Sequence, residues 1–214
     1  MRRARVQARL WQAALWGLAL APALVLLGRT LGNRLGANPV EELTLELGQW
    51  ALRFLLLTLA ATPVRRLTGW NGLVRHRRLL GLTAAAYALL HLLVYAVLDQ
   101  GLLWSQIIGD VFKRPFITAG MAAFLLLLPL AATSCDAAIR RLGARRWQAL
   151  HRLAYVATGA ALLHFWWKVK VDTREPAIYL TVFALLLAAR WVAPGRRSRR
   201  TAAAPRPTIP RPPD

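Results

Sequence analysis

The chain has 214 residues, of which 57% are hydrophobic, and its mean hydropathy of +0.38 is too high for an ordinary soluble domain. In a soluble protein the formal net charge of +20 would suggest nucleic-acid binding, but here the arginines lie between apolar runs of membrane-spanning length, so we expect no nucleic-acid partner. Cys135 is the only cysteine, which excludes an intrachain disulfide and any zinc or iron–sulfur site built from cysteine pairs.

Six apolar runs of roughly 16–20 residues predict six membrane-spanning helices. The runs are Leu10–Gly28, Leu43–Thr62, Leu79–Leu98, Phe116–Thr133, Gln148–Trp167 and Ala177–Val192. Prolines fall at the edges of these runs, where the missing backbone N–H is tolerated: Pro39, Pro63, Pro115 and Pro176. We therefore expect an all-α integral membrane protein built as a six-helix bundle.

The two ends of the chain differ in composition from the predicted bundle. Residues 1–9 are basic, and the apolar run after them is longer than the core of a secretory signal. Pro22 follows the small residues Ala19 and Ala21 and disfavours cleavage there, so we expect a retained first helix. Residues 193–214 are rich in arginine and proline, which predicts a disordered, lipid-attracted tail. The transmembrane domain is thus predicted to span residues 10–192.

The positive charges indicate how the predicted bundle is oriented in the membrane. The N-terminus, residues 63–78, residues 134–147 and the tail together carry nineteen Lys and Arg residues, whereas the connections on the opposite side carry seven. Because cytoplasmic connections are enriched in Lys and Arg, both termini are predicted to be cytoplasmic.

Three histidines interrupt the apolar runs, and ionisable residues inside a membrane span are costly enough to suggest a function. His151 and His164 are thirteen residues apart in the fifth run, which places them ~20 Å apart along a helix axis and ~140° apart around it. His164 and His91, in the third run, both fall in the outer half of the membrane. Neutral imidazole is a good iron ligand, so this pair predicts a haem between two helices. The alternative is a pair of structural histidines with hydrogen bonds across helices.

Two other positions are harder to interpret from the sequence. His151 lies near the cytoplasmic side of the predicted bundle. The only histidine that could pair with it there is His76, which we expect to be an ordinary loop residue. Arg53 lies ~15 Å from the end of the second run, near the midplane, on a polar stripe with Glu46 and Gln49. It either pairs with Glu46 or holds an anion such as a haem propionate.

Several segments together resemble a known family. They are GLVRHRRLLGL, LLHLLVY, KRPFITAG, LPLAATS, RRLGARRWQALHRLAYV and HFWWKVK. They resemble the MsrQ proteins (formerly YedZ), membrane haem subunits of bacterial periplasmic methionine-sulfoxide reductase systems, from about Leu10 to Val192. The wider group is the ferric-reductase-like transmembrane domain, shared with NADPH oxidases.

This resemblance implies a b-type haem and an FMN, with His91, His151 and His164 as haem-linked residues. It implies a multi-pass protein of the bacterial inner membrane that acts as an electron-transfer subunit rather than the catalytic subunit. The electrons would pass outward to a periplasmic molybdenum-containing reductase, MsrP, which repairs oxidised methionine.

The electron donor is expected to be a separate molecule. Larger relatives in the ferric-reductase group continue into a cytoplasmic FAD and nicotinamide domain, whereas only 22 residues, 193–214, follow the sixth run here, and no G-x-G-x-x-G motif follows a strand. We therefore expect membrane quinol or a cytoplasmic flavin reductase as the donor. Two alternatives are a stand-alone ferric or quinone reductase and a non-redox transporter, the latter weakened by the scarcity of buried acids and of internal repeats.

Overall fold

The structure, a computed structural model, describes residues 2–192 and contains no β-strand among them, which confirms the all-α class. The predicted tail, 193–214, lies outside the described residues. The helices are α1 (Arg2–Leu31), α2 (Pro39–Thr68), α3 (Gly72–Val94), a π-helical turn η1 (Tyr95–Asp99), α4 (Trp104–Lys113), α5 (Pro115–Ala132), α6 (Asp136–Leu142), α7 (Ala144–His151), α8 (Leu153–Lys168) and α9 (Arg174–Val192).

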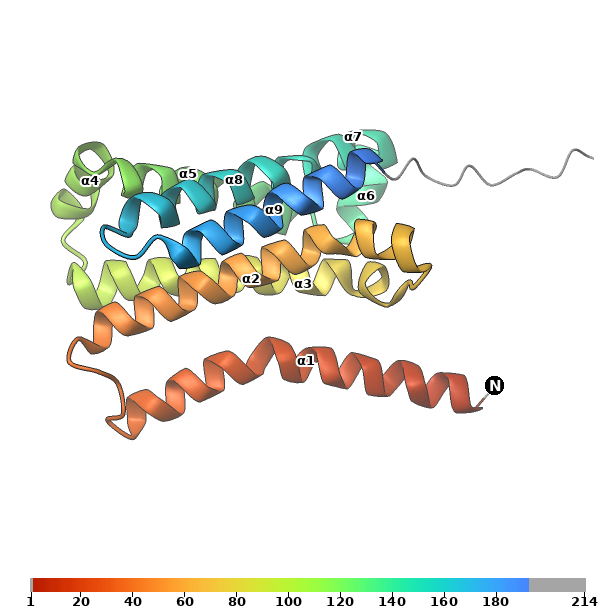
Figure 1. Cartoon of the computed structure of the whole chain (residues 1–214), viewed down its shortest axis with the longest axis horizontal. Helices are drawn as coiled ribbons and strands as arrows, with labels where there is room; N and C mark the ends of the chain where they lie inside the picture. The colour runs from red at the N-terminus through yellow and green to blue at the C-terminus, as the bar shows by residue number, and fades with distance from the viewer. Residues whose placement is uncertain (1, 193–214) are drawn as a thin grey trace, which may run out of the picture.

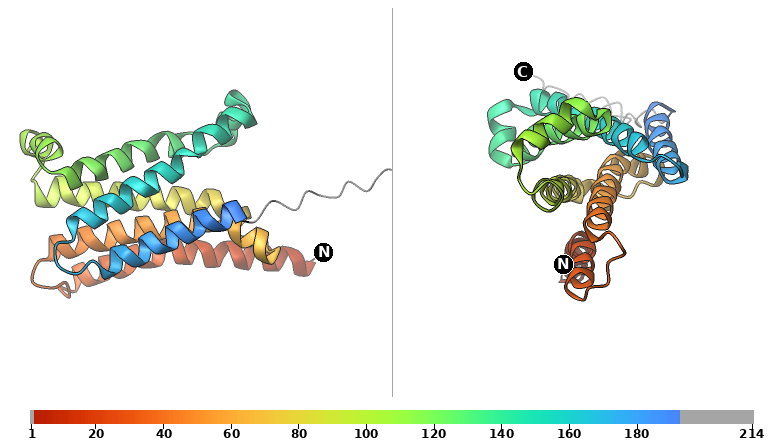
Figure 2. Two further views of the ribbon diagram at one scale, coloured as in Figure 1. Left: turned by 45° about the horizontal axis from the view of Figure 1, so that its top comes forward. Right: turned by 90° about the vertical axis from the view of Figure 1, so that its left-hand side faces the viewer.

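The long helices form an antiparallel bundle in which two helix pairs dominate the packing. Helix α2 packs along α3, and α5 packs along α8, while α9 contacts both α2 and α8 (Figures 1 and 2). Helix α1 lies at the side of the bundle, against α2 and α3. Helix α1 begins and α9 ends at the same end, which we call the N-terminal end; α4 and the α1–α2 connection lie at the opposite, far end.

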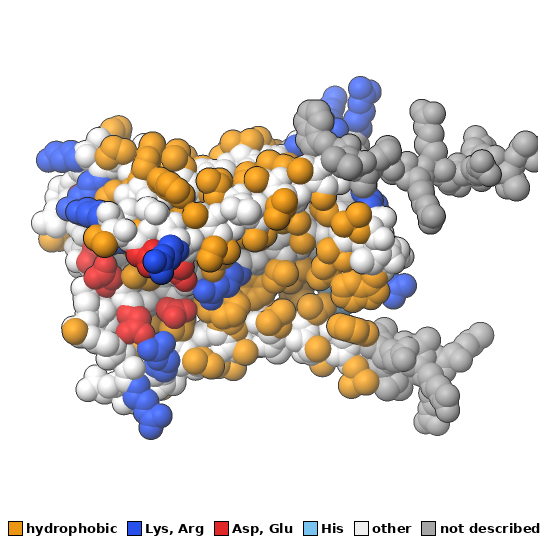
Figure 3. All heavy atoms as spheres, viewed as in Figure 1, with side chains coloured by type: hydrophobic (Ala, Val, Ile, Leu, Met, Phe, Trp, Pro, Cys, Tyr) orange, Lys and Arg blue, Asp and Glu red, His pale blue; other side chains and the backbone are white. Residues whose placement is uncertain are grey.

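Four helical segments are long and apolar enough to cross a membrane: Leu10–Leu31, Pro39–Thr68, Gly72–Asp99 and Pro115–Ala132. They contain the first three predicted spans and all of the fourth except its last residue, Thr133. The fifth predicted run falls on the end of α7 and on α8, of 16 residues, and the sixth falls on α9, of 19 residues; neither α8 nor α9 is among these four segments. Figure 3 shows hydrophobic side chains along the length of the bundle; on this face the acidic side chains gather near the far end, whereas basic side chains lie at both ends.

The second and third helices are longer than predicted. Helix α2 continues past Pro63, which therefore lies inside the helix rather than at its edge, and ends at Gly69 in the left-handed conformation (φ 74°). Helix α3 then begins at Gly72, so the prediction that His76 lies in a loop was wrong. Arginine is a good helix former, and its long side chain keeps its charge in water, so a basic segment can extend a membrane helix.

The fifth predicted span is interrupted. Helix α7 ends at His151, and α8 begins at Leu153, with Arg152 between them. The N–H of Arg152 bonds to the carbonyl of Ala149 and the N–H of Tyr155 bonds to the carbonyl of Arg152, so the helical ladder tightens to i→i−3 bonds here. His151 and His164 consequently belong to different helices.

A buried tyrosine attaches α1 to the bundle. The hydroxyl of Tyr87 on α3 donates to the carbonyl of Ala19 (2.8 Å) and accepts the N–H of Ala23 (3.0 Å). In a regular helix this N–H would bond directly to that carbonyl, so the hydroxyl is inserted into the backbone ladder of α1. Pro22, which has no N–H, adjoins the opened turn, and α1 bends midway along its length (Figure 1). The tyrosine therefore completes the hydrogen bonding of a bent helix.

We predict that Tyr87→Phe loosens α1 while leaving the rest of the bundle folded. The substitution leaves a buried N–H and a buried carbonyl without their partner, at a cost of about 1–3 kcal/mol. Hydrogen exchange of the purified protein should show faster exchange in the α1 turn around Ala23. Thr181→Val, which removes a hydroxyl bond on the exposed surface of α9, should not change exchange in α1. Unchanged α1 exchange in Tyr87→Phe would show that the hydroxyl does not hold this turn.

Candidate functional site

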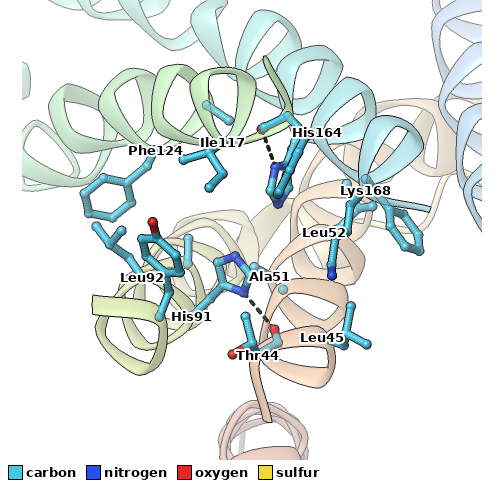
Figure 4. A pocket seen from close by; sticks show the side chains of 18 of the residues that line it. Thr44, Leu45, Ala51, Leu52, His91, Leu92, Ile117, Phe124, His164 and Lys168 are labelled. Atoms are coloured by element: carbon cyan, nitrogen blue, oxygen red, sulfur yellow. Dashed lines mark hydrogen bonds between the residues drawn. The ribbon is translucent and has the colours of Figure 1, made fainter. Parts of the chain in front are cut away.

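Two histidines from different helix pairs face each other near the far end. His91 on α3 and His164 on α8 have ring centroids 5.9 Å apart and ring planes at 81° (Figure 4). A metal ion bound about 2 Å from one nitrogen of each ring would put the centroids roughly 6 Å apart. The two residues that the sequence placed at similar depth are therefore brought together at a separation that suits one shared metal.

Each of these imidazoles is oriented by a backbone carbonyl. The Nδ1 atom of His91 lies 2.7 Å from the carbonyl oxygen of Thr44, and that of His164 lies 2.6 Å from the carbonyl oxygen of Phe116 (Figure 4). A carbonyl oxygen can only accept a hydrogen bond, so in both residues Nδ1 carries the proton. A neutral imidazole protonated at Nδ1 has its lone pair on Nε2, and metal-binding histidines commonly adopt this arrangement.

A glycine lies four residues after each of these carbonyls. A Cβ atom on Gly48 would lie 3.0 Å from the Nδ1 of His91, and one on Gly120 would lie 2.8 Å from the Nδ1 of His164. In an α-helix the side chain at position i+4 stands on the same face as residue i and leans back toward it. Glycine at i+4 therefore uncovers the carbonyl and lets an imidazole from the neighbouring helix reach it.

The same small arrangement thus occurs twice, once in α2 and α3 and once in α5 and α8. Each copy has a carbonyl, a glycine one turn later and a histidine from the adjacent helix. Neither the two carbonyl residues nor the two glycines were predicted from the sequence. The detectable signal was a glycine inside an apolar span, in the segments T-L-E-L-G (44–48) and F-I-T-A-G (116–120).

The two histidines line a cavity of about 400 Å³, which is within the usual range for a cofactor site. Its walls are mainly apolar and come from α2, α3, α5 and α8; they include Leu52, Leu55, Phe124 and Leu127. Charged side chains from the far end complete the lining: Glu41, Asp99, Arg114 and Lys168. The cavity therefore combines an apolar body, two imidazoles and a charged rim.

The two cations of the rim are each paired with an acid. Arg114 lies 3.1 Å from Oδ1 of Asp110, and Oδ2 of the same carboxylate accepts a hydrogen bond from the hydroxyl of Tyr95 (2.9 Å). Lys168 lies 3.2 Å from a carboxylate oxygen of Glu41. These pairs are partly exposed and hold the cations at the edge of the cavity.

This combination fits a haem better than a bare metal ion. In the part of the chain that the structure describes, no group of three or more His, Cys, Asp or Glu side chains could hold a metal ion. Two imidazoles alone leave most of a metal's coordination positions unfilled, whereas a haem supplies four nitrogens of its own and needs only axial ligands. Apolar walls suit the macrocycle, and cations at the rim suit its two carboxylates.

Arg53 is placed beside this cavity rather than in its lining. Its Nε donates to the hydroxyl of Tyr179 (2.7 Å), and a terminal nitrogen donates to the side-chain oxygen of Gln49 (2.9 Å). The guanidinium also lies over the Trp50 ring, 4.6 Å from its centroid. Among the described residues it makes no ion pair with Glu46. The bond to Gln49 links Arg53 to the cavity, because Gln49 is one of the residues that line it.

His151 lies at the N-terminal end, apart from the cavity. Its ring stacks on Trp147, with centroids 3.9 Å apart, and its Nε2 lies 3.2 Å from the hydroxyl of Thr133. That hydroxyl donates to the carbonyl of Pro129 (2.6 Å), so it accepts from His151, whose Nε2 carries the proton. Within residues 2–192 no hydrogen bond or ring contact joins His151 to His76. The structure therefore separates His151 from the histidine pair.

Comparison with known proteins supports one family. The ferric reductase like transmembrane component family matches residues 47–162. A protein-methionine-sulfoxide reductase heme-binding subunit MsrQ of Ralstonia nicotianae is 52% identical, with 86% of this chain and 87% of the relative covered. The subunit of the same name from Rhodospirillum rubrum is 49% identical, with 92% and 94% covered. No solved structure gives a significant match.

We predict that the two glycines are required for the orientation of the imidazoles. In Gly120→Ala and Gly48→Ala the new methyl group should displace the ring from its carbonyl, and the purified protein should lose most of its low-spin haem spectrum. Gly159→Ala is a matched control on α8, because a Cβ there meets nothing within 4 Å. A low-spin spectrum of wild-type intensity in both glycine variants would contradict this role.

Proposed function

The chain belongs to the ferric reductase like transmembrane family, and from its similarity to MsrQ subunits within that family we propose that it is the b-type haem-binding, electron-transfer subunit of a methionine-sulfoxide reductase system. The observation that carries the proposal is the pair of imidazoles, His91 and His164. Both are protonated at Nδ1 by their hydrogen bonds to carbonyls, and both line one apolar cavity.

In this proposal Nε2 of His91 and Nε2 of His164 would hold the haem iron. The apolar side chains of α2, α3, α5 and α8 enclose the macrocycle and keep water away. Arg114 and Lys168, at the rim, are the cations that border the cavity and suit the haem carboxylates. When bound, the haem supplies a one-electron carrier. With two histidines to hold the iron, the haem would serve to carry electrons rather than to bind a substrate.

Arg53 is proposed to act on the same cavity through Gln49. The guanidinium fixes the amide of Gln49, which lines the cavity, and it places a positive charge near mid-membrane. Such a charge would stabilise a negative charge on the cofactor side of α2.

We further propose that the protein crosses the bacterial inner membrane six times, with both termini in the cytoplasm. Two features support this: α1 begins and α9 ends at the same end of the bundle, and that end carries most of the Lys and Arg residues. The histidine pair then lies near the periplasmic face, where the acceptor would be the periplasmic reductase MsrP. Quinol or a cytoplasmic flavin reductase, with an FMN, would deliver electrons at the opposite face.

We predict that His91→Ala and His164→Ala each abolish or convert most of the low-spin haem signal. Each substitution removes one axial nitrogen while leaving the other. The measurement is the reduced visible spectrum of the purified protein, with haem content determined chemically. His76→Ala, on the same helix as His91 but far along it, is the control and should keep the wild-type spectrum. An unchanged α-band in both single variants would exclude the proposed ligation.

His151 is proposed to act at the cytoplasmic side, as a ligand of a second haem or as a neighbour of the flavin. We expect His151→Ala to slow haem reduction by a quinol analogue or reduced FMN while preserving the signal of the His91–His164 haem. Stopped-flow reduction of the purified variant measures this. Reduction at the wild-type rate would make His151 a structural residue that packs on Trp147.

A further inference from the structure

Helix α4 does not run along the bundle but lies at its far end (Figures 1 and 2). The segment before it, Gly72–Asp99, and the segment after it, Pro115–Ala132, are each long and apolar enough to cross a membrane. Helix α4 itself has 10 residues and is therefore only ~15 Å long, about half the thickness of the hydrocarbon layer. It consequently lies near the level at which these two spans leave the membrane.

Helix α4 carries large apolar side chains that the rest of the chain leaves exposed. Trp104, Ile108 and Phe112 follow one another at intervals of four residues, so they share one side of the helix, and we call them the apolar row of α4. Their exposed fractions are 67%, 56% and 84%. Ile107, in contrast, is 6% exposed and packs against the bundle. The described residues, 2–192, thus leave the apolar row largely uncovered.

The helical spacing of about 100° per residue shows which way the apolar row faces. Taking Ile107 as the side that faces the bundle, the row is centred about 100° around the helix from it. Asp110 lies about 60° away in the opposite direction, where its carboxylate contacts Tyr95 and Arg114 at the cavity rim. The row therefore faces sideways, away from the rim, along the end of the bundle.

This direction favours lipid over a soluble protein as the partner. A protein that docked on the end of the bundle would meet the side of α4 opposite Ile107, which carries Ser105 and Gly109 rather than large apolar residues. The sideways direction instead leads to the surroundings of the membrane-spanning segments. A row that faces these surroundings at the end of two spans meets the boundary between the acyl chains and the head groups.

The chain next to α4 supports the same assignment. Large apolar side chains are exposed in η1 and in the connection to α4: Val97, Leu98, Leu102 and Leu103. Exposed apolar surface therefore continues from the end of a membrane-spanning segment onto α4. Trp104 begins the helix, and tryptophan is enriched at the interface between membrane and water.

We propose that α4 is an interfacial helix whose apolar row binds the phospholipid bilayer at the boundary of its acyl chains and head groups. Amphipathic helices lie in the plane of this boundary with their apolar side in the lipid. The other edge of the helix holds Asp110 against Tyr95 and Arg114, so contact with lipid fixes the helix that supplies a carboxylate to the cavity rim. The proposal rests on the membrane-spanning segments and does not depend on the haem or on electron transfer.

The test measures the depth of spin labels on α4 in the full-length protein, reconstituted in nanodiscs of phosphatidylethanolamine and phosphatidylglycerol. The native cysteine is first replaced by Cys135→Ser, because serine can keep the hydrogen bond that the cysteine accepts at the start of α6. Ile108→Cys then places a label in the apolar row, and Ser105→Cys places the matched control label on the polar side of the same helix. Power-saturation electron paramagnetic resonance compares collisions with oxygen, which enters lipid, and with a nickel chelate, which stays in water.

We expect the label at position 108 to have an oxygen-to-nickel collision ratio about tenfold higher than that of the label at position 105. Equal access of the nickel chelate to both labels would overturn the proposal, because the row would then lie in water. Protection of the label at position 108 from both reagents would also overturn it, because protein would then cover the row. Spin–spin broadening in that case would identify the protein as a second copy of the chain.

A second measurement tests whether lipid contact fixes the helix. Ile108→Asp places a charge in the lipid boundary, whereas Ser105→Asp places the same charge on the polar side. Amide hydrogen exchange across α4 in nanodiscs should become about tenfold faster in Ile108→Asp and change less than about twofold in Ser105→Asp. Equal effects of the two variants, or no effect of either, would contradict the proposal. The haem spectrum, recorded in parallel, tests the proposed function separately.

Discussion

The site depends on two backbone carbonyls that accept a hydrogen bond from outside their own helix. The carbonyls of Thr44 and Phe116 are ordinary members of their helices, and each is uncovered because the residue four positions later is glycine. Since a carbonyl cannot donate, each fixes the imidazole that reaches it as the Nδ1-protonated form. One contact thereby sets the position, the orientation and the tautomer of a ligand inside a membrane bundle.

The packing of the helices brings each histidine within reach of its carbonyl. Helices α2 and α3 must lie close together for His91 to reach α2, and α5 and α8 must do so for His164 to reach α5. The two pairs then meet around an apolar cavity, with their charged residues at its rim. The two ends of the molecule differ chemically: the far end has paired acids and bases beside the histidines, and the N-terminal end is rich in arginine.

Much of this could be predicted from the sequence because membrane spans and their histidines follow from composition and spacing. The apolar runs located the long helices, and the matching depth of His91 and His164 indicated that they meet. The ends of helices were less predictable. The basic segment around His76 is helical, because arginine can lie both in a helix and at the membrane interface, so its presence does not mark where a helix begins. The carbonyl and glycine contacts were missed because they depend on which helix faces which. The partners of Arg53, Tyr179 above all, lie 126 residues away in sequence and follow from the packing of α9 on α2.

The central claim is that Nε2 of His91 and Nε2 of His164 bind one haem iron. Electron-nuclear double resonance of the oxidised protein, with histidine labelled by ¹⁵N at Nε2, tests it most directly. We predict two strongly coupled ¹⁵N nuclei on one low-spin iron, with one of them lost when either His91 or His164 is replaced. A single coupled histidine nitrogen in the wild-type protein, or coupling to Nδ1 in place of Nε2, would contradict it.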